Sequence, residues 1–256
     1  MRTDHYRDRL MESNCLVTKL SNYLALSNKD VDLLLKLQSE EADYPKKVTV
    51  REAGNETAEL YVVKHGWLYS STTLPDGRRQ VLQLHYPGDI VGIPDVAFDY
   101  STVNLETITD VCLCPFRKNR LDEVFINSSR LTALLFSFGM VDYMVLLDRI
   151  RAISRMNAEE RIAHFLLEVS SRLRITNKNQ SNHIDMPLTQ EIIGDAVGLT
   201  NVYVSKSMRK LEDQGLIARD KRTIEIKDHN SLKEMVDFRD RYFKLDTSWF
   251  PESKIP

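Results

Sequence analysis

The periodicity of the apolar residues changes near Ser128, and this change divides the chain into parts of different architecture. Downstream of it, apolar residues recur every seven positions, with two more between them: Leu131, Phe138, Val145 and Ala152, then Leu134 and Val141. This repeat predicts a helix of some seven turns over residues 128–156. We expect these residues to form a homodimer interface, and packing against a sheet of the same chain is the alternative.

Short apolar runs separated by turn signals precede this helix, from about Val48 to Phe125. Runs such as LYVVKH and VLQLHY alternate with REAGN, LPDGRR and YPGD, and short strands at such spacing are typical of an antiparallel sandwich or barrel. In the sequence PDG, Pro75 presets φ and Gly77 accepts a positive φ, which favours a hairpin turn. We therefore expect an N-terminal antiparallel, jelly-roll-like β-roll in an α+β protein.

The composition is that of an ordinary soluble globular protein, with 256 residues, 42% hydrophobic and 28% charged, and a net charge of −2. Because the chain is not basic overall, any affinity for nucleic acid must come from a local patch. Its three cysteines are too few for a disulfide framework and favour the reducing cytoplasm. No apolar run approaches the ~18–20 residues of a membrane span, and the charged N-terminus is unlike a signal peptide. We expect a cytoplasmic protein with no membrane partner.

A second helix is expected after the long one. The sequence NAEER places Asn157 three residues before Glu160, which is a variant of the capping box. This pattern predicts a helix from Ala158 to about Arg174. The polar run Thr176–His183 that follows is expected to be a loop.

The stretch LTQEIIGDAVGLTNVYVSKSMRKLEDQGLI carries the pattern of a helix-turn-helix. Thr189 is a good cap for a helix that runs from Gln190 to about Val197. Gly198 ends that helix with a positive φ, and Thr200 caps the next one. Two short helices joined by a three-residue turn that contains Gly are typical of this motif.

The second of these short helices should turn one face to the core and the other to DNA. Val204, Met208 and Leu211 are spaced to face the core, and the charged turn between LIAR and TIEIK predicts a small wing. Recognition helices enter the major groove by their N-terminal half, while nearby hydroxyls and cations fix phosphates. A solvated helix whose charges only aid solubility is the alternative. We expect double-stranded DNA to contact Thr189, Gln190, Thr200, Asn201, Val202, Tyr203, Ser205, Lys206, Arg209, Lys210, Lys221 and Arg222.

Four motifs in order resemble those of the Crp–Fnr superfamily of bacterial transcription regulators, and they cover nearly the whole chain. AGNETAELYVVKHGWL resembles an early β-roll segment, HYPGDIVG a Pro-Gly-Asp turn, ERIAHFLL the helix after the hinge, and IGDAVGLTNVYVSKSMRKLEDQGLI the helix-turn-helix. The resemblance implies a β-roll sensor, a long dimerisation helix and a C-terminal winged helix-turn-helix. It also implies a homodimer that binds a pseudo-palindromic operator and acts on RNA polymerase.

These patterns and the resemblance predict four segments. They are the N-terminal helices and β-roll sensor domain in residues 1–127, the dimerisation helix in 128–156, the winged helix-turn-helix domain in 157–245 and a C-terminal tail in 246–256. The segments before Leu26 and after Phe243 are expected to be peripheral.

The start of the second short helix departs from the family pattern S/T-R-E-T-V. Asn201 and Val202 stand where the family has Arg and Glu, and Tyr203 follows. Val cannot accept the hydrogen bond that Glu accepts from cytosine. Lys206 matches a base-reading Arg of the family, and Asn201 could pair with adenine. We therefore expect an operator that differs from the common half-site of the family.

The β-roll also departs from the cassette G-E-L…R-S/T of the cyclic-nucleotide-binding relatives. Gly92 matches the Gly, Ile93 replaces the Glu, and Tyr100 falls near the Arg. No Lys or Arg occurs between Arg79 and Arg117, and a buried phosphate without a cation is costly. We therefore expect no binding of cyclic AMP or cyclic GMP. A pocket for an unknown apolar effector is a hypothesis for Gly92, Ile93, Phe98, Tyr100 and Ser101, and a β-roll that senses nothing is equally compatible with the sequence.

Other cofactors define the alternative function. Oxygen-sensing relatives hold a four-iron cluster through mostly N-terminal cysteines, and only Cys15 lies there, so we do not expect that cluster. Cys112 and Cys114 face one side of a strand, where they are core residues or, alternatively, a metal-binding or redox pair. His65 and His85 are candidate haem ligands. The alternative is thus a haem-, metal-, redox- or ligand-sensing receptor with conditional or degenerate DNA binding. Since the chain lacks GxSxG, HExxH, CxxC and phosphate-loop motifs, we do not expect an enzyme.

Overall fold

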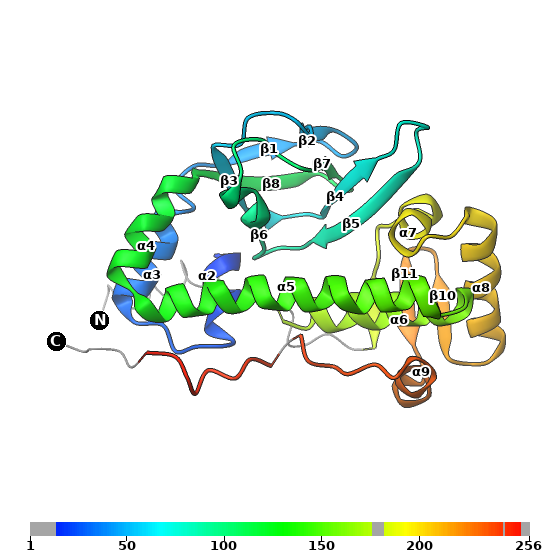
Figure 1. Ribbon diagram of the computed structural model, residues 1–256. Helices are drawn as coiled ribbons and strands as arrows, with labels where there is room; N and C mark the ends of the chain where they lie inside the picture. The colour runs from blue at the N-terminus through cyan, green and yellow to red at the C-terminus, as the bar shows by residue number, and fades with distance from the viewer. Residues whose placement is uncertain (1–13, 176–181, 243, 252–256) are drawn as a thin grey trace. The chain divides into compact units, whose positions relative to one another are not determined.

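The computed structural model describes residues 14–175, 182–242 and 244–251, whose elements are shown in Figure 1. Contacts divide the chain into two compact units. The first unit holds the described residues up to Thr72, Leu84–Met140 and those from Lys244 onward, and the second holds Thr73–Gln83 and the described residues from 141 to 242. The division therefore lies inside the long helix, whereas the sequence placed boundaries at its two ends.

Two four-stranded antiparallel sheets form the framework of the β-roll, as predicted. One sheet has the strand order β1-β8-β3-β6, and the other has the order β2-β7-β4-β5. Turns with left-handed glycines separate many of the strands, and one of these is Gly77 after Pro75. The strands are β1 (Ala42–Tyr44), β2 (Thr49–Arg51), β3 (Glu59–His65), β4 (Leu68–Thr73), β5 (Arg79–His85), β6 (Ile90–Val91), β7 (Asn104–Thr107) and β8 (Val111–Arg117).

Short helices pack beside the sheets of the first unit. They are α2 (Cys15–Ser21), α3 (Asn28–Lys36), η1 (Ile93–Ala97), η2 (Lys118–Arg120) and α4 (Leu121–Asn127). Leu16 and Leu20 of α2 are buried in one apolar cluster with Leu60 of β3, and Phe250 is buried in the same cluster. The prediction that both ends of the chain are peripheral is therefore wrong for these residues, because their apolar side chains complete this core.

The long helix is α5 (Ser129–Arg155), a continuous helix of 27 residues that is labelled in Figure 1. Its length confirms the prediction from the seven-residue repeat. It ends before Asn157, whose side chain accepts a hydrogen bond from the Glu160 backbone N–H at 3.0 Å while the Glu160 carboxylate accepts from the Asn157 N–H. This reciprocal capping box is the one predicted, and it starts α6 (Ala158–Leu173).

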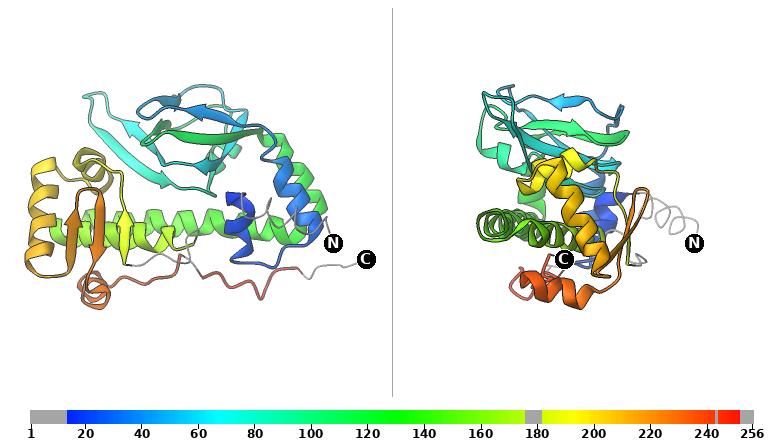
Figure 2. Two further views of the ribbon diagram at one scale, coloured as in Figure 1. Left: turned by 180° about the vertical axis from the view of Figure 1, so that it is seen from behind. Right: turned by 90° about the vertical axis from the view of Figure 1, so that its right-hand side faces the viewer.

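The second unit contains the remaining helices and a small sheet. Its elements are β9 (His183–Asp185), α7 (Gln190–Val197), α8 (Asn201–Asp213), β10 (Ile217–Asp220), β11 (Thr223–Ile226) and α9 (His229–Val236). The sheet has the order β10-β11-β9 and lies beside α8 in Figure 2. The predicted loop at Thr176–His183 lies outside the described residues for positions 176–181, and His183 begins β9.

Buried charges join α5 to α6 within the second unit. Arg149 donates from Nε and Nη2 to the two carboxylate oxygens of Glu168, at 2.8 and 2.7 Å. Burial, the largest single influence, favours a raised pKa for Glu168, but the charge and hydrogen bonds of Arg149, together with the charges of Arg172 and His164, outweigh it and hold the pKa below its usual range. The neighbouring His164 is also buried, and burial lowers its pKa.

Candidate nucleic-acid interface

The turn between α7 and α8 has the geometry of a helix-turn-helix. Thr189 Oγ1 accepts a hydrogen bond from the Ile192 N–H at 3.2 Å and so caps α7, as predicted. Gly198 ends α7 in the left-handed region, with φ at 67°. A Cβ at Gly194 would lie 2.4 Å from the Leu199 carbonyl oxygen, so the turn can fold back on α7 only because this residue is glycine.

The helix α8 has the two faces that the sequence predicts. Val204, Met208 and Leu211 are buried, which fixes the orientation of the helix on its own unit. Thr200 is the N-cap residue of α8, as predicted, although its side chain makes no capping hydrogen bond. The opposite face is open to solvent and carries Thr200, Asn201, Val202, Tyr203, Ser205, Lys206, Arg209 and Lys210.

The cations of α8 have different surroundings. Among the described residues, no carboxylate forms an ion pair with Lys206. Lys210 Nζ lies 2.7 Å from a carboxylate oxygen of Glu159, and the charge of Arg209 contributes to a lowered pKa of Glu212 after the larger effect of Arg219. The N-terminal half of the exposed face therefore presents Lys206 as its cation.

The predicted wing is present as the hairpin of β10 and β11. The two strands pair in antiparallel register up to Asp220 opposite Thr223. Lys221 lies in the left-handed region with φ at 54°, and both Lys221 and Arg222 are exposed at the turn. The hairpin thus adds two cations to the same unit as α8, and Thr189 and Gln190 at the start of α7 are exposed as well.

The predicted dimer residues of α5 lie on the side of the helix that faces its own chain. Leu131, Leu134, Val145 and Ala152 are buried within a single chain, and Phe138 and Val141 are partly buried. This side of the helix packs against its own chain and so offers little surface to a second copy, and the interface at these residues stays a prediction.

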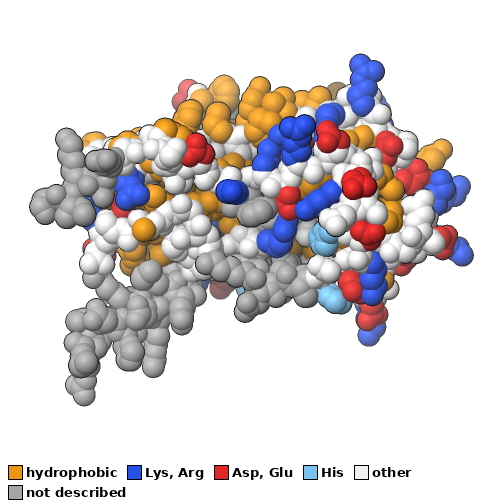
Figure 3. Space-filling model, turned by 90° about the horizontal axis from the view of Figure 1, so that it is seen from below, with side chains coloured by type: hydrophobic (Ala, Val, Ile, Leu, Met, Phe, Trp, Pro, Cys, Tyr) orange, Lys and Arg blue, Asp and Glu red, His pale blue; other side chains and the backbone are white. Residues whose placement is uncertain are grey.

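A second apolar stripe on α5 faces solvent. Its residues repeat with alternating spacings of four and three, and between 38% and 60% of the surface of each is exposed: Phe136, Met140, Tyr143, Leu147 and Ile150. Figure 3 shows hydrophobic side chains gathered along one edge of the face that it draws. This α5 stripe has the a/d spacing of a coiled-coil seam.

Among the described residues, α5 is also the one helix that is long and apolar enough, by length and composition, to cross a membrane. The expectation that no segment approaches such a length is therefore wrong. The reason is that apolar residues occupy two sides of α5, one buried in its own chain and one in the α5 stripe.

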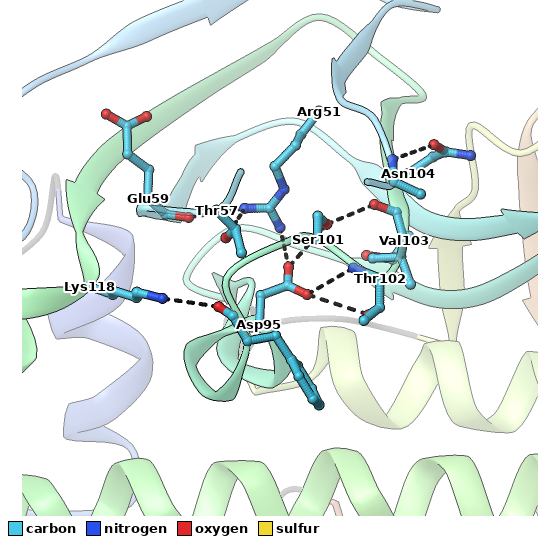
Figure 4. Close-up of polar contacts among 12 residues, drawn as sticks. Arg51, Thr57, Glu59, Asp95, Ser101, Thr102, Val103, Asn104 and Lys118 are labelled. Atoms are coloured by element: carbon cyan, nitrogen blue, oxygen red, sulfur yellow. Dashed lines mark hydrogen bonds and ion pairs between the residues drawn. The ribbon is translucent and has the colours of Figure 1, made fainter. Parts of the chain in front are cut away.

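The β-roll contains a buried cluster of polar side chains, drawn in Figure 4. Arg51 of β2 donates from Nη2 to Asp95 of η1, and both residues are buried. Ser101 Oγ lies 3.3 Å from the same carboxylate. Arg51 was not predicted, because a cation for this site was expected only between Arg79 and Arg117. Arg51 instead lies in β2, earlier in the chain.

The residues predicted for an apolar effector pocket differ in their exposure. Phe98 and Tyr100 are 53% and 62% exposed, whereas Ser101 is buried against Asp95. Gly92 is buried and Ile93 is half-buried at the start of η1. This segment turns Asp95 inward and its large apolar side chains outward, and the effector pocket stays a prediction.

The two thiols of β8 differ in their surroundings, since Cys114 is buried in the core and Cys112 is half-buried with Sγ 3.6 Å from Glu41 Oε2. Burial, the largest influence, raises the pKa of Cys112 to about 12 and that of Cys114 to about 11, so both are protonated and weakly nucleophilic at neutral pH. His85 is buried with Nε2 2.7 Å from Ser70 Oγ, and His65 is exposed. In the described part of the chain, no three His, Cys, Asp or Glu residues form a metal-binding group.

Comparisons with known proteins match both units. Residues 41–128 match the cyclic nucleotide-binding domain, and residues 160–235 match the Crp-like helix-turn-helix domain. The anaerobic regulatory protein of Haemophilus influenzae is 23% identical over 222 residues, which cover 87% of this chain and 86% of that protein. A probable transcriptional activator of Rhizobium leguminosarum is 28% identical over 184 residues, or 72% and 75% of the two chains.

A solved structure has the same fold. FixK2 from Bradyrhizobium japonicum superimposes with a TM-score of 0.69 at 25% identity, and the match covers 77% of this chain and 96% of that one. The two domain matches occur in the order of the β-roll and the winged helix-turn-helix described above. This chain therefore belongs to the Crp–Fnr superfamily, whose members are transcription regulators with a cyclic nucleotide-binding-like domain and a helix-turn-helix DNA-binding domain.

Proposed function

We propose that the protein acts in the cytoplasm as a homodimer, binds a pseudo-palindromic operator in double-stranded DNA and regulates transcription with RNA polymerase as its partner. The observation that carries this proposal is the exposed face of α8. Val204 and Met208 on the opposite face are buried and fix the helix on its unit. Asn201 and Lys206 are exposed, so they are accessible to the major groove of DNA. A helix held in this way can present side chains to base edges without reorganisation.

The exposed side chains fall into two groups by chemistry. Asn201 can form a bidentate pair with adenine, and Lys206 can donate to guanine O6 or N7. The remaining polar and basic residues suit phosphates and fix the register of the protein on the duplex: Thr189, Gln190, Thr200, Ser205, Arg209, Lys210, Lys221 and Arg222. Val202 and Tyr203 offer apolar contact in place of a hydrogen-bond acceptor for cytosine.

The dimer is proposed to form through the α5 stripe. Its five apolar residues have the seam spacing of a two-stranded coiled coil, and a two-fold axis along it would present two copies of α8. Recognition helices of such a dimer lie about 34 Å apart, one turn of DNA. The same stripe supports the proposal that α5 is a subunit contact and not a membrane span.

Salt dependence and sequence selection test this function together. We expect the binding constant to fall steeply with salt, with a slope of about −0.9 for each phosphate contact. Lys221→Ala should reduce the magnitude of this salt slope by about 2 for the dimer, whatever the DNA sequence. Lys206→Ala should instead change the base preference at one position of each half-site. Lys46→Ala, at an exposed lysine of the first unit, is the matched control and should change neither. Binding that is independent of salt in the native protein would refute the proposal.

Operator choice provides a separate measurement. In vitro selection with the native protein and with Val202→Glu should give different half-sites, because only the variant can accept a hydrogen bond from cytosine. Identical selected half-sites would contradict the assigned position of Val202. For the β-roll, we propose that cyclic AMP is not an effector, and a rise in melting temperature at micromolar cyclic AMP would refute this.

A further inference from the structure

A buried acid and a buried base face each other inside the first unit. Asp95 of η1 has 2% of its surface exposed, and Arg51 of β2 has 8%. The Arg51 guanidinium donates to the Asp95 carboxylate through Nη2. The pair therefore joins a short helix to a strand that lies more than forty residues earlier in the chain.

Other donors converge on the same carboxylate, as Figure 4 shows. The Thr102 backbone N–H and Oγ1 lie 3.3 and 3.4 Å from Asp95 Oδ1, and Ser101 Oγ lies 3.3 Å from Oδ2. The Ser101 hydroxyl also lies 2.9 Å from the Val103 carbonyl oxygen, to which it can donate its proton instead. A planar guanidinium, a backbone N–H and hydroxyls are the groups that proteins use to bind carboxylate and phosphate oxygens. These donors form an oxyanion receptor, and Asp95 is the oxyanion within it.

Contacts other than that with Asp95 hold Arg51 in place. Its Nη1 donates to Thr57 Oγ1 at 3.2 Å and to the Glu59 carbonyl oxygen at 3.0 Å. Gly92 lies beside the guanidinium: a Cβ there would be 2.9 Å from Leu60 Cδ2 and in ordinary contact with Arg51 Nη2, at 3.4 Å. The buried Nε of Arg51 has no hydrogen-bond partner among the described residues. The receptor thus retains its cation and its shape when the carboxylate is removed.

We propose that Asp95 is a built-in anion that keeps an oxyanion receptor of the β-roll filled. In the native protein this receptor takes no acidic effector, because an incoming carboxylate or phosphate would have to displace a tethered group. Replacement of Asp95 by Ala opens the receptor to a small carboxylate of the same size, such as formate. This inference goes beyond the proposed function and holds whether or not the protein binds DNA.

Thermal unfolding of the full chain in sodium formate and in sodium chloride of equal ionic strength tests the proposal. A dissociation constant of about 10 mM would shift the folding equilibrium of Asp95→Ala about 11-fold in about 100 mM formate, which raises Tm by about 3 °C. The native protein should show no formate-specific rise. Asp99→Ala, which removes an exposed acid of the same segment, is the matched control and should also show none.

Two further variants separate the receptor from a general salt effect. Asp95→Asn fills the space, and Arg51→Met combined with Asp95→Ala removes the cation, so neither should gain stability from formate. Absence of a formate-specific rise in Asp95→Ala, or an equal rise in the double variant, overturns the proposal. If Asp95→Ala does not fold in chloride, its refolding yield from urea is measured instead. A yield several-fold higher in formate supports the proposal, and equal yields overturn it.

Discussion

Ile150 of the α5 stripe offers the sharpest test of how two copies associate. Its side chain belongs to a stripe with coiled-coil spacing, and 55% of its surface is exposed in one chain. Replacing it by Asp should leave the fold of the single chain intact, because the position is open to water. The same change should disrupt a two-fold contact, since both copies would bring a carboxylate into an apolar seam.

The expected magnitude follows from the exposed fraction. Full burial of an Ile side chain contributes about 1.5–3 kcal/mol, so covering about half of it contributes roughly 0.8–1.6 kcal/mol per copy and about 2–3 kcal/mol per dimer. At about 1.4 kcal/mol per tenfold change, this loss alone raises the dimer dissociation constant roughly 30- to 150-fold. Burial of two unpaired carboxylates costs several kcal/mol more, so we expect an increase of at least about 1,000-fold.

Sedimentation equilibrium measures this constant directly, and circular dichroism checks that the variant is folded. Leu74→Asp is the matched control, because it introduces the same carboxylate at an aliphatic residue that is 48% exposed outside α5. We expect Leu74→Asp to dimerise like the native protein. If Ile150→Asp also keeps the native dissociation constant, the α5 stripe is not the subunit interface and the reasoning from its spacing is refuted.

Three further predictions concern the second unit. Arg149→Met should lower the free energy of unfolding of the second unit, measured in urea, by about 3–5 kcal/mol, because Glu168 is left buried without its ion pair to Arg149. The double variant Arg149→Met, Glu168→Leu should recover most of this loss. Burial lowers the pKa of His164, so as the pH falls the unfolded chain binds a proton at this residue before the folded chain does. The free energy of unfolding should therefore decrease below about pH 6.5. His164→Leu should make the free energy of unfolding depend less on pH between about pH 5 and 7. Gly194→Ala would place a Cβ 2.4 Å from the Leu199 carbonyl oxygen, so it should cost about 1–3 kcal/mol and weaken DNA binding, and native stability in this variant would contradict the close packing of the turn.

The α5 helix illustrates what periodicity can and cannot predict. The repeat of Leu131, Phe138 and Val145 correctly predicted a long helix, but Phe136, Tyr143 and Ile150 repeat with the same period. Both stripes satisfy a coiled-coil pattern. Which of them packs against the chain itself depends on β-roll and α6 surfaces that come from distant parts of the sequence, and no local pattern specifies this choice.

The helix-turn-helix was more predictable than the β-roll cluster for a related reason. The caps, the glycine turn and the core spacing of α7 and α8 are all set within thirty consecutive residues, and the structure places Thr189, Gly198 and Val204 as predicted. The pairing of Arg51 with Asp95 instead joins separate elements, and its residue types have no fixed spacing. A long-range contact of this kind leaves no periodic signal in the sequence.

The burial of Phe250 in the core of the first unit, with the partly buried Leu245 packed against that core, has a consequence for synthesis. These residues follow α9 along the chain, yet they pack with Leu16 and Leu20 from near the N-terminus. On the ribosome, the core that begins with α2 stays open until the whole second unit has been translated. The helices from α6 to α9 can therefore mature first, and the domain that is translated first is completed last.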